Sequence, residues 1–141
     1  MLKRAVVWLA LLCALGSAVT TYAQAQSSPL KWLSLATTNS TLALGRPTVL
    51  NDILTVNTTT TIYYLKFYNK KTAPTCGTDT PVWTVPVPYG SSNSGGGVSH
   101  SSLGGLLFPL GLGFCLTSGI ADNDTGSAAT GITINLGLSG R

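Results

Sequence analysis

The chain has 141 residues, enough for one domain of ordinary size, and only 9% of them are charged. Glutamate is absent, while glycine, serine and threonine are abundant, which favours a turn-rich, all-β domain over a helical one. The formal net charge of +4 falls to +2 without Lys3 and Arg4 (6 basic minus 4 acidic residues), and the remaining basic residues are scattered, so we expect no nucleic-acid partner.

The first residues, MLKRAVVWLALLCALGSAVTTYAQAQ, contain the three parts of a secretory signal peptide. Two basic residues precede an apolar run over residues 5–15, and a segment of small residues ends at Ala25. Cleavage is predicted after Ala25, with Ala23 as the alternative site. Because the apolar run is shorter than the ~20 residues of a membrane span, we expect no span in the mature protein. The predicted organisation is a signal peptide at residues 1–25, one domain at residues 26–141, and a secreted or periplasmic location.

After a lead-in at residues 27–34, turn signals alternate with short runs of β-prone residues. They predict seven strands, at residues 34–44, 48–57, 61–69, 81–87, 96–102, 112–120 and 130–138. Seven strands at this spacing indicate a single antiparallel β-sandwich of the jelly-roll or immunoglobulin-like type.

In the third predicted strand, two sets of side chains alternate. Tyr63, Leu65 and Phe67 share one face and are expected to point inward, while Tyr64, Lys66 and Tyr68 share the other. The second set is a candidate surface platform for a glycan or a partner. The alternative, which we favour, is that this face packs on the second sheet or on a neighbouring subunit.

The fourth strand contains Pro86 and is followed by Pro88, and neither residue can donate a hydrogen bond to a neighbouring strand. This strand is therefore predicted at a sheet edge. The last strand is predicted to be half buried, with Ile132, Ile134, Leu136 and Leu138 on its inner face.

The search for reactive groups gives little. His100 lies in a Gly/Ser-rich stretch at residues 90–105 that we expect to be mobile, which argues against a catalytic triad. Asp122 and Asp124 offer a partial calcium-loop pattern, but a turn stabilised by Asx side chains is preferred. We therefore predict no enzyme activity, no cofactor and no metal site. Three segments match the N-glycosylation pattern, beginning at Asn39, Asn57 and Asn123.

Removal of the signal peptide leaves two cysteines, Cys76 and Cys115. In an oxidising compartment, an isolated pair of cysteines in a small domain predicts a disulfide. If its strand is regular, Cys115 points away from the inward set Leu112, Phe114 and Leu116, so the disulfide would clamp a loop across the outside of the sandwich.

Two segments carry a family resemblance: YYLKFYNKKTAPTCGTDTPVWTVPVP at residues 63–88 and LFPLGLGFCLTSGIADNDTGSAATGITINL at residues 107–136. They resemble small β-sandwich proteins of tailed phages and prophages, of the decoration, head-fibre or tail-accessory type. The resemblance implies a sandwich fold, a virion-associated role and no catalytic residues. The signal peptide and the cysteine pair depart from the family pattern, so we expect either a host-encoded secreted relative or a surface structure unrelated to phage.

The predicted function is that of a non-enzymatic, secreted structural or surface-interaction module. Its expected partners are further copies of itself or a repeating cell or virion surface, because the chain is 44% hydrophobic and sparsely charged. The alternative is a secreted carbohydrate-binding module that uses outward aromatic residues, and a small secreted hydrolase is the least favoured.

Overall fold

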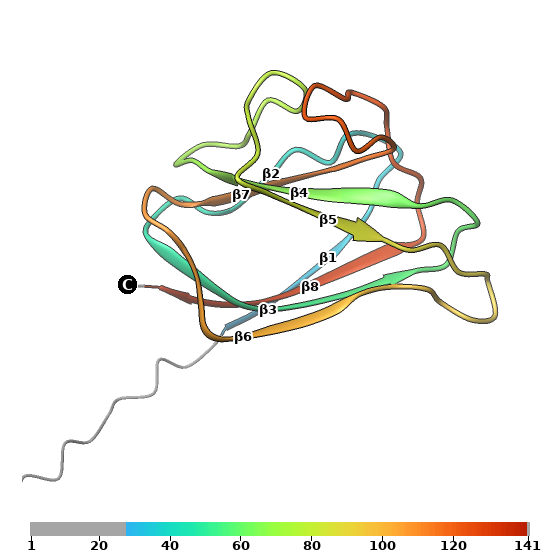
Figure 1. Ribbon diagram of the computed structural model, residues 1–141, viewed down its shortest axis with the longest axis horizontal. Coiled ribbons are helices and arrows are strands. Elements are labelled where there is room, and N and C mark those ends of the chain that lie inside the picture. The colour runs from blue at the N-terminus through green and yellow to red at the C-terminus, as the bar shows by residue number, and fades with distance from the viewer. Residues whose placement is uncertain (1–27, 141) are drawn as a thin grey trace, which may run out of the picture.

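The structure, a computed structural model, describes residues 28–140, so the predicted signal peptide at residues 1–25 lies outside the described residues. The elements of the described chain are eight strands: β1 (Ser28–Leu33), β2 (Thr41–Leu44), β3 (Thr48–Asn57), β4 (Tyr63–Asn69), β5 (Trp83–Val87), β6 (Ser99–Phe108), β7 (Leu112–Thr117) and β8 (Ile132–Gly140). They form two four-stranded sheets, with strand orders β1-β8-β3-β6 and β2-β7-β4-β5, which lie face to face in two layers (Figure 1).

All the strand pairs are antiparallel. This strand order, in which β7 and β8 each lie between two earlier strands, is that of an eight-stranded jelly roll. The predicted all-β sandwich is therefore confirmed, and its topology is the first of the two types that the sequence left open.

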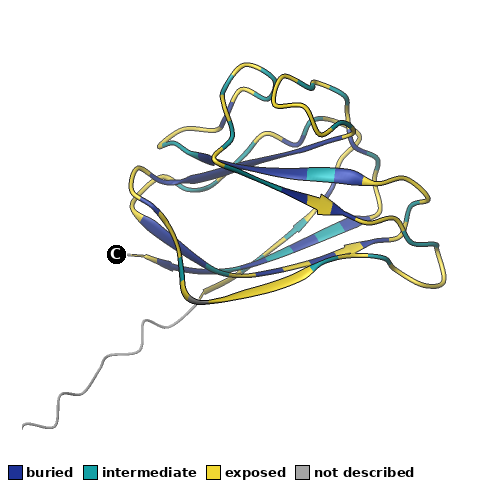
Figure 2. Ribbon diagram, viewed as in Figure 1, coloured by how far each residue is buried: buried dark blue, intermediate teal, exposed yellow. Residues whose placement is uncertain are grey.

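The core lies between the two sheets, and Figure 2 shows buried residues along the strands of both. In β8 the four predicted inward residues, Ile132, Ile134, Leu136 and Leu138, are all buried. Strand β5 forms one edge of its sheet, as the prolines predict, and Pro86 is exposed there.

The predicted first strand, at residues 34–44, and the predicted count of seven strands are wrong. The lead-in instead forms β1, and only Thr41–Leu44 is a strand in that region, which gives eight strands in the described chain. Between β1 and β2 the chain turns around the side chain of Asn39, which accepts a hydrogen bond from the Leu35 N–H (2.7 Å) and donates to the carbonyl oxygens of Leu35 and Thr37. Asn39 has a φ of 55°, a conformation that asparagine tolerates better than most residues.

The Gly/Ser-rich stretch also differs from its prediction, because β6 begins inside it, at Ser99, and is ten residues long. The glycines before it serve close backbone contacts. A Cβ on Gly96 would lie 2.0 Å from the carbonyl oxygen of Tyr89, and one on Gly97 would lie 2.0 Å from that of Thr55. Glycine here allows two backbone segments to approach closely. A high glycine content can indicate either such close contacts or a mobile segment, and composition alone does not distinguish the two.

Candidate functional site: a loop cap and an edge cleft

A disulfide joins Cys76 to Cys115, as the sequence predicts, with a Cα–Cα distance of 6.0 Å. Cys115 lies in β7 between the core residues Phe114 and Leu116, so its side chain points to the outer face of the sheet. Cys76 belongs to the loop 70–82 that connects β4 to β5. The disulfide therefore holds this loop across the outer face of the sheet β2-β7-β4-β5.

A second loop, 118–131, lies beside the first above the same sheet (Figure 1). The Asp124 carboxylate accepts a hydrogen bond from the Gly119 N–H (2.8 Å), and the Asp124 N–H donates to the Ala121 carbonyl (2.9 Å), which is the turn that we preferred over a calcium loop. The two loops touch, since a Cβ on Gly77 would lie 2.4 Å from Thr125 Cγ2. We call loops 70–82 and 118–131 together the loop cap.

The candidate platform of Tyr64, Lys66 and Tyr68 lies beneath the loop cap. Lys66 and Tyr68 are 0% exposed, and Tyr64 is half-buried. The prediction that Tyr64, Lys66 and Tyr68 form a surface platform, with Lys66 facing solvent, is therefore wrong. The favoured alternative also needs correction, because the chain's own loops cover this face, and neither the second sheet nor a neighbouring subunit is required.

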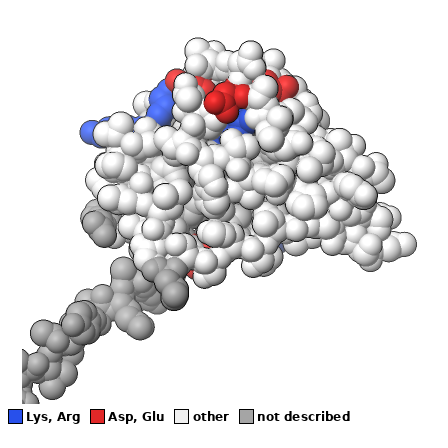
Figure 3. All heavy atoms as spheres, in the orientation of Figure 1, with Lys and Arg blue, Asp and Glu red and all other residues white. Residues whose placement is uncertain are grey.

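Lys66 is fully buried. Its Nζ donates a hydrogen bond to the Ala121 carbonyl oxygen of the loop cap. Burial lowers the pKa of Lys66 from its usual value, and the negative charges of Asp124 and Asp122 partly oppose this shift. The lysine therefore ties β4 to the loop above it. Figure 3 shows acidic side chains gathered at the top of the molecule, with basic side chains beside them.

Tyr68 is buried without a hydrogen bond to its hydroxyl group from any residue of the described chain. Burial raises the pKa of Tyr68 to about 12, and the nearby charges of Asp122 and Asp79 add to the effect. Asp79 itself pairs with Lys70 and accepts the Thr75 N–H. That hydrogen bond to Lys70 is the main reason why the pKa of Asp79 lies below its usual value.

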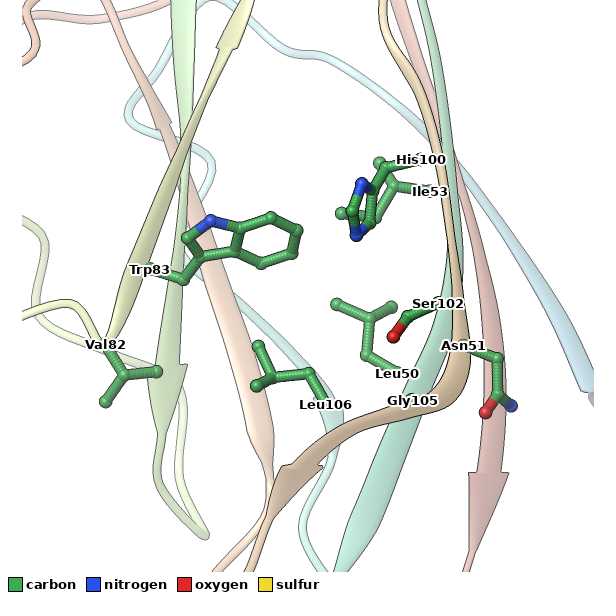
Figure 4. Close-up of a pocket in the computed structure, with 9 residues that line it drawn as sticks. All are labelled: Leu50, Asn51, Ile53, Val82, Trp83, His100, Ser102, Gly105 and Leu106. Carbon is green, nitrogen blue, oxygen red and sulfur yellow. The ribbon is translucent and has the colours of Figure 1, made fainter.

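A cleft opens at the sandwich edge formed by β5 and β6 (Figure 4). It has a volume of about 260 Å³, and the residues that line it are Leu50, Asn51, Ile53, Val82, Trp83, His100, Ser102, Gly105 and Leu106. Trp83 stacks on Phe67, with ring centroids 5.6 Å apart. Across the gap, Trp83 and His100 point toward one another, with ring centroids 5.3 Å apart and planes at 65°.

A β-bulge accompanies this cleft. In the register between β3 and β6, Leu50 pairs with Leu106 and Asp52 with Ser101, so residues 102–105 face the single residue Asn51. Gly105 lies within the bulge with a φ of 68°, a value that favours glycine. The extra residues displace the edge strand from regular pairing beside the cleft.

The sequence did not identify the cleft. His100 was set aside as part of a mobile segment, whereas it lies in β6 with its ring against Trp83. The available signal was the pair Gly104-Gly105 before an apolar run, which is typical of a bulge inside a strand.

The three glycosylation patterns differ in access. Asn39 and Asn57 are buried, and their side chains hydrogen-bond to neighbouring backbone groups. Asn123 is exposed in the loop cap. Across residues 28–140, His, Cys, Asp and Glu form no group of three that could hold a metal ion. The same residues contain no helix long and apolar enough to cross a membrane.

Comparison of the chain with protein-family models, curated proteins and solved structures finds no match.

Proposed function

We propose that this chain is a non-enzymatic, exported structural or surface-interaction module. It contacts further copies of itself, or a repeating cell or virion surface, through the outer face of the sheet β1-β8-β3-β6. The observation that carries this proposal is the exposed apolar character of that face, together with its sparse charge. The phage-like resemblance of residues 63–88 and 107–136 is in keeping with such a role.

The register places three exposed apolar side chains of this face close together. Leu33 of β1 pairs with Thr133 of β8, which pairs in turn with Val56 of β3. Leu54 and Val56 lie on the same, outer side of β3, because the residues that alternate with them, Ile53 and Thr55, are buried. Leu33, Leu54 and Val56 are 61%, 49% and 37% exposed. We call these three residues the apolar face.

Charge is distributed unequally between the two sheets. Lys31 and Asp52 are the charged residues that the described strands place on the outer side of β1-β8-β3-β6. Lys70, Lys71, Asp79, Asp122 and Asp124 lie instead in the loop cap, on the opposite side of the molecule. Sparse charge weakens the repulsion between approaching surfaces, and exposed contiguous apolar area favours association. The loop cap covers the central strands β4 and β7 of the other sheet, whereas the apolar face has no such cover among the described residues.

The test is light scattering on the exported protein across micromolar concentrations at physiological salt, combined with retention on cell, virion and glycan surfaces. The expected result is a mass that rises with concentration, or retention on a repeating surface. Leu54→Lys is expected to abolish either behaviour, because it places a charge in the apolar face. Ile120→Lys is the matched control, since Ile120 is 65% exposed in the loop cap. A strictly monomeric protein that none of these surfaces retains would contradict the proposal.

A further inference from the structure

We propose that the cleft between β5 and β6 binds one aromatic side chain of a partner polypeptide. The cleft lies at the edge of the sandwich, between the two sheets, and its lining residues are distinct from the apolar face. This inference therefore goes beyond the proposed function and can fail separately from it.

The walls of the cleft favour an uncharged, ring-shaped occupant. Leu50 and Ile53 come from β3, and Leu106 comes from β6 (Figure 4). Trp83 comes from β5 of the other sheet, and Val82 directly precedes it in loop 70–82. No charged side chain is among the described residues that line it. Its volume of about 260 Å³ is slightly below the range of ~300–1,000 Å³ typical of sites for drug-sized ligands, which suits a single side chain.

The polar groups of the cleft are too few for a sugar. They belong to Asn51, His100 and Ser102, and the Asn51 amide already donates to Ser139 Oγ at 3.2 Å. A pyranose ring brings several hydroxyl groups, and each one buried without a partner costs about 1–3 kcal/mol. A tyrosine or tryptophan side chain brings one polar group, for which His100 or Ser102 is sufficient. Its ring also packs on Trp83 in the edge or offset geometries that aromatic pairs prefer.

The rim of the cleft favours a polypeptide over a free aromatic molecule. Val82 is 59% exposed and Leu106 is 41% exposed, so apolar surface continues outside the volume that a single ring can fill. The chain flanking an inserted side chain would cover this rim, as in interfaces where neutral contacts exclude water around an anchor residue.

Strand addition is a less suitable mode of binding at this edge. Pro86 of β5 has no N–H to donate, and the bulge at residues 102–105 interrupts the regular edge of β6. A partner therefore gains little from backbone hydrogen bonds along either strand. Binding would depend on the side chain inserted between the strands.

The experiment is an NMR titration of the ¹⁵N-labelled exported protein. After the predicted cleavage, Trp32 and Trp83 are the remaining tryptophans, so the spectrum contains one indole N–H signal in the cleft and one internal control. The probes are N-acetyl-tyrosinamide, N-acetyl-leucinamide, p-cresol and methyl glucoside. We expect N-acetyl-tyrosinamide to give a saturable shift of the Trp83 signal, to leave Trp32 unmoved, and to bind more tightly than the other three probes.

Two neighbouring variants test the location. Leu106→Ala removes a wall of the cleft and is expected to weaken binding about tenfold, as is usual for a contact at an anchor site. Leu107→Ala changes the next residue, which is similarly exposed (46%) but does not line the cleft, and should leave binding unchanged. Equal effects of the two variants, no saturable shift, or an equal response to leucinamide or glucoside would overturn the inference. Tighter binding of p-cresol than of the blocked tyrosine would overturn the polypeptide partner. A protein that assembles normally but shows no shift refutes the inference and leaves the proposed function standing.

Discussion

Removal of the disulfide is expected to destabilise the fold strongly, because the bond closes a long loop. The change is the double substitution Cys76→Ala and Cys115→Ala, with alanine chosen because Cys115 is fully buried and serine would bury a hydroxyl group. The sequence separation is 39 residues. For a closed loop of about 40 residues, the chain-entropy relation gives ~13 cal/mol/K, or about 4 kcal/mol at 25 °C.

The expected fall in melting temperature follows from the size of the domain. An unfolding entropy of ~2.1 cal/mol/K per residue over about 115 residues gives ~0.24 kcal/mol/K. A loss of about 4 kcal/mol then lowers the melting temperature by roughly 16 °C. Thermal unfolding followed by circular dichroism measures this difference between the oxidised protein and the double variant. Chemically reduced wild-type protein is the control and should unfold close to the variant.

The same bond is expected to shield Lys66, because it holds the loop cap over β4. Acetylation of the Lys66 amine, followed by peptide mass spectrometry, should accelerate after reduction, while that of the exposed Lys71 should not change. If reduction lowers the melting temperature by less than about 4 °C and leaves Lys66 protected, then the cap is held by other contacts and the loop-closure reasoning is wrong.

Two further substitutions test the buried polar groups. Tyr68→Phe should stabilise the protein by about 1 kcal/mol, because it removes a buried hydroxyl group that has no partner in the described chain. The pKa of Tyr68 is about 12 in the folded protein and ~10 in the unfolded chain, so the unfolded state loses the phenol proton at a lower pH. The free energy of unfolding of the wild type should therefore fall between pH ~10 and ~12, and that of the variant should fall less. Urea unfolding at pH 8 and pH 11 measures both effects, and a variant less stable at pH 8 would contradict them. Asn57→Ala should destabilise the fold by about 2 kcal/mol or more. The Asn57 side chain is fully buried, donates a hydrogen bond to the Thr61 carbonyl and accepts one from the Thr59 N–H. Asn123→Ala, at an exposed position, is the control and should change stability by less than ~0.5 kcal/mol.

Much of the fold could be predicted from the sequence, because it depends on local patterns. Alternation identified the inner face of β8, and Pro86 identified an edge strand. The pairing of Cys76 with Cys115 followed from an even count of cysteines after removal of the predicted signal peptide. Each of these inferences needs only neighbouring residues or a count.

The covered face could not be predicted in the same way. Alternation correctly separated Tyr64, Lys66 and Tyr68 from the inward set, but it reports which side of a strand a residue takes and not what lies above that side. The cover consists of two loops distant in sequence, whose packing against each other rests on close contacts such as that of Gly77 with Thr125. The cleft was missed for a related reason, since a bulge changes the register between two strands and leaves only a pair of glycines as its local sign.

The position of β8 has a consequence for how the chain reaches its folded state. This strand is the last of the eight in chain order, yet it pairs with both β1 and β3 in the middle of its sheet, and β7 likewise separates β2 from β4. Neither sheet can close until β7 and β8 have been synthesised, so pairing is dominated by distant segments and folding is expected to be slow. Late closure is compatible with the export that we propose, because a chain that is still open can pass through a secretion channel as an extended polypeptide.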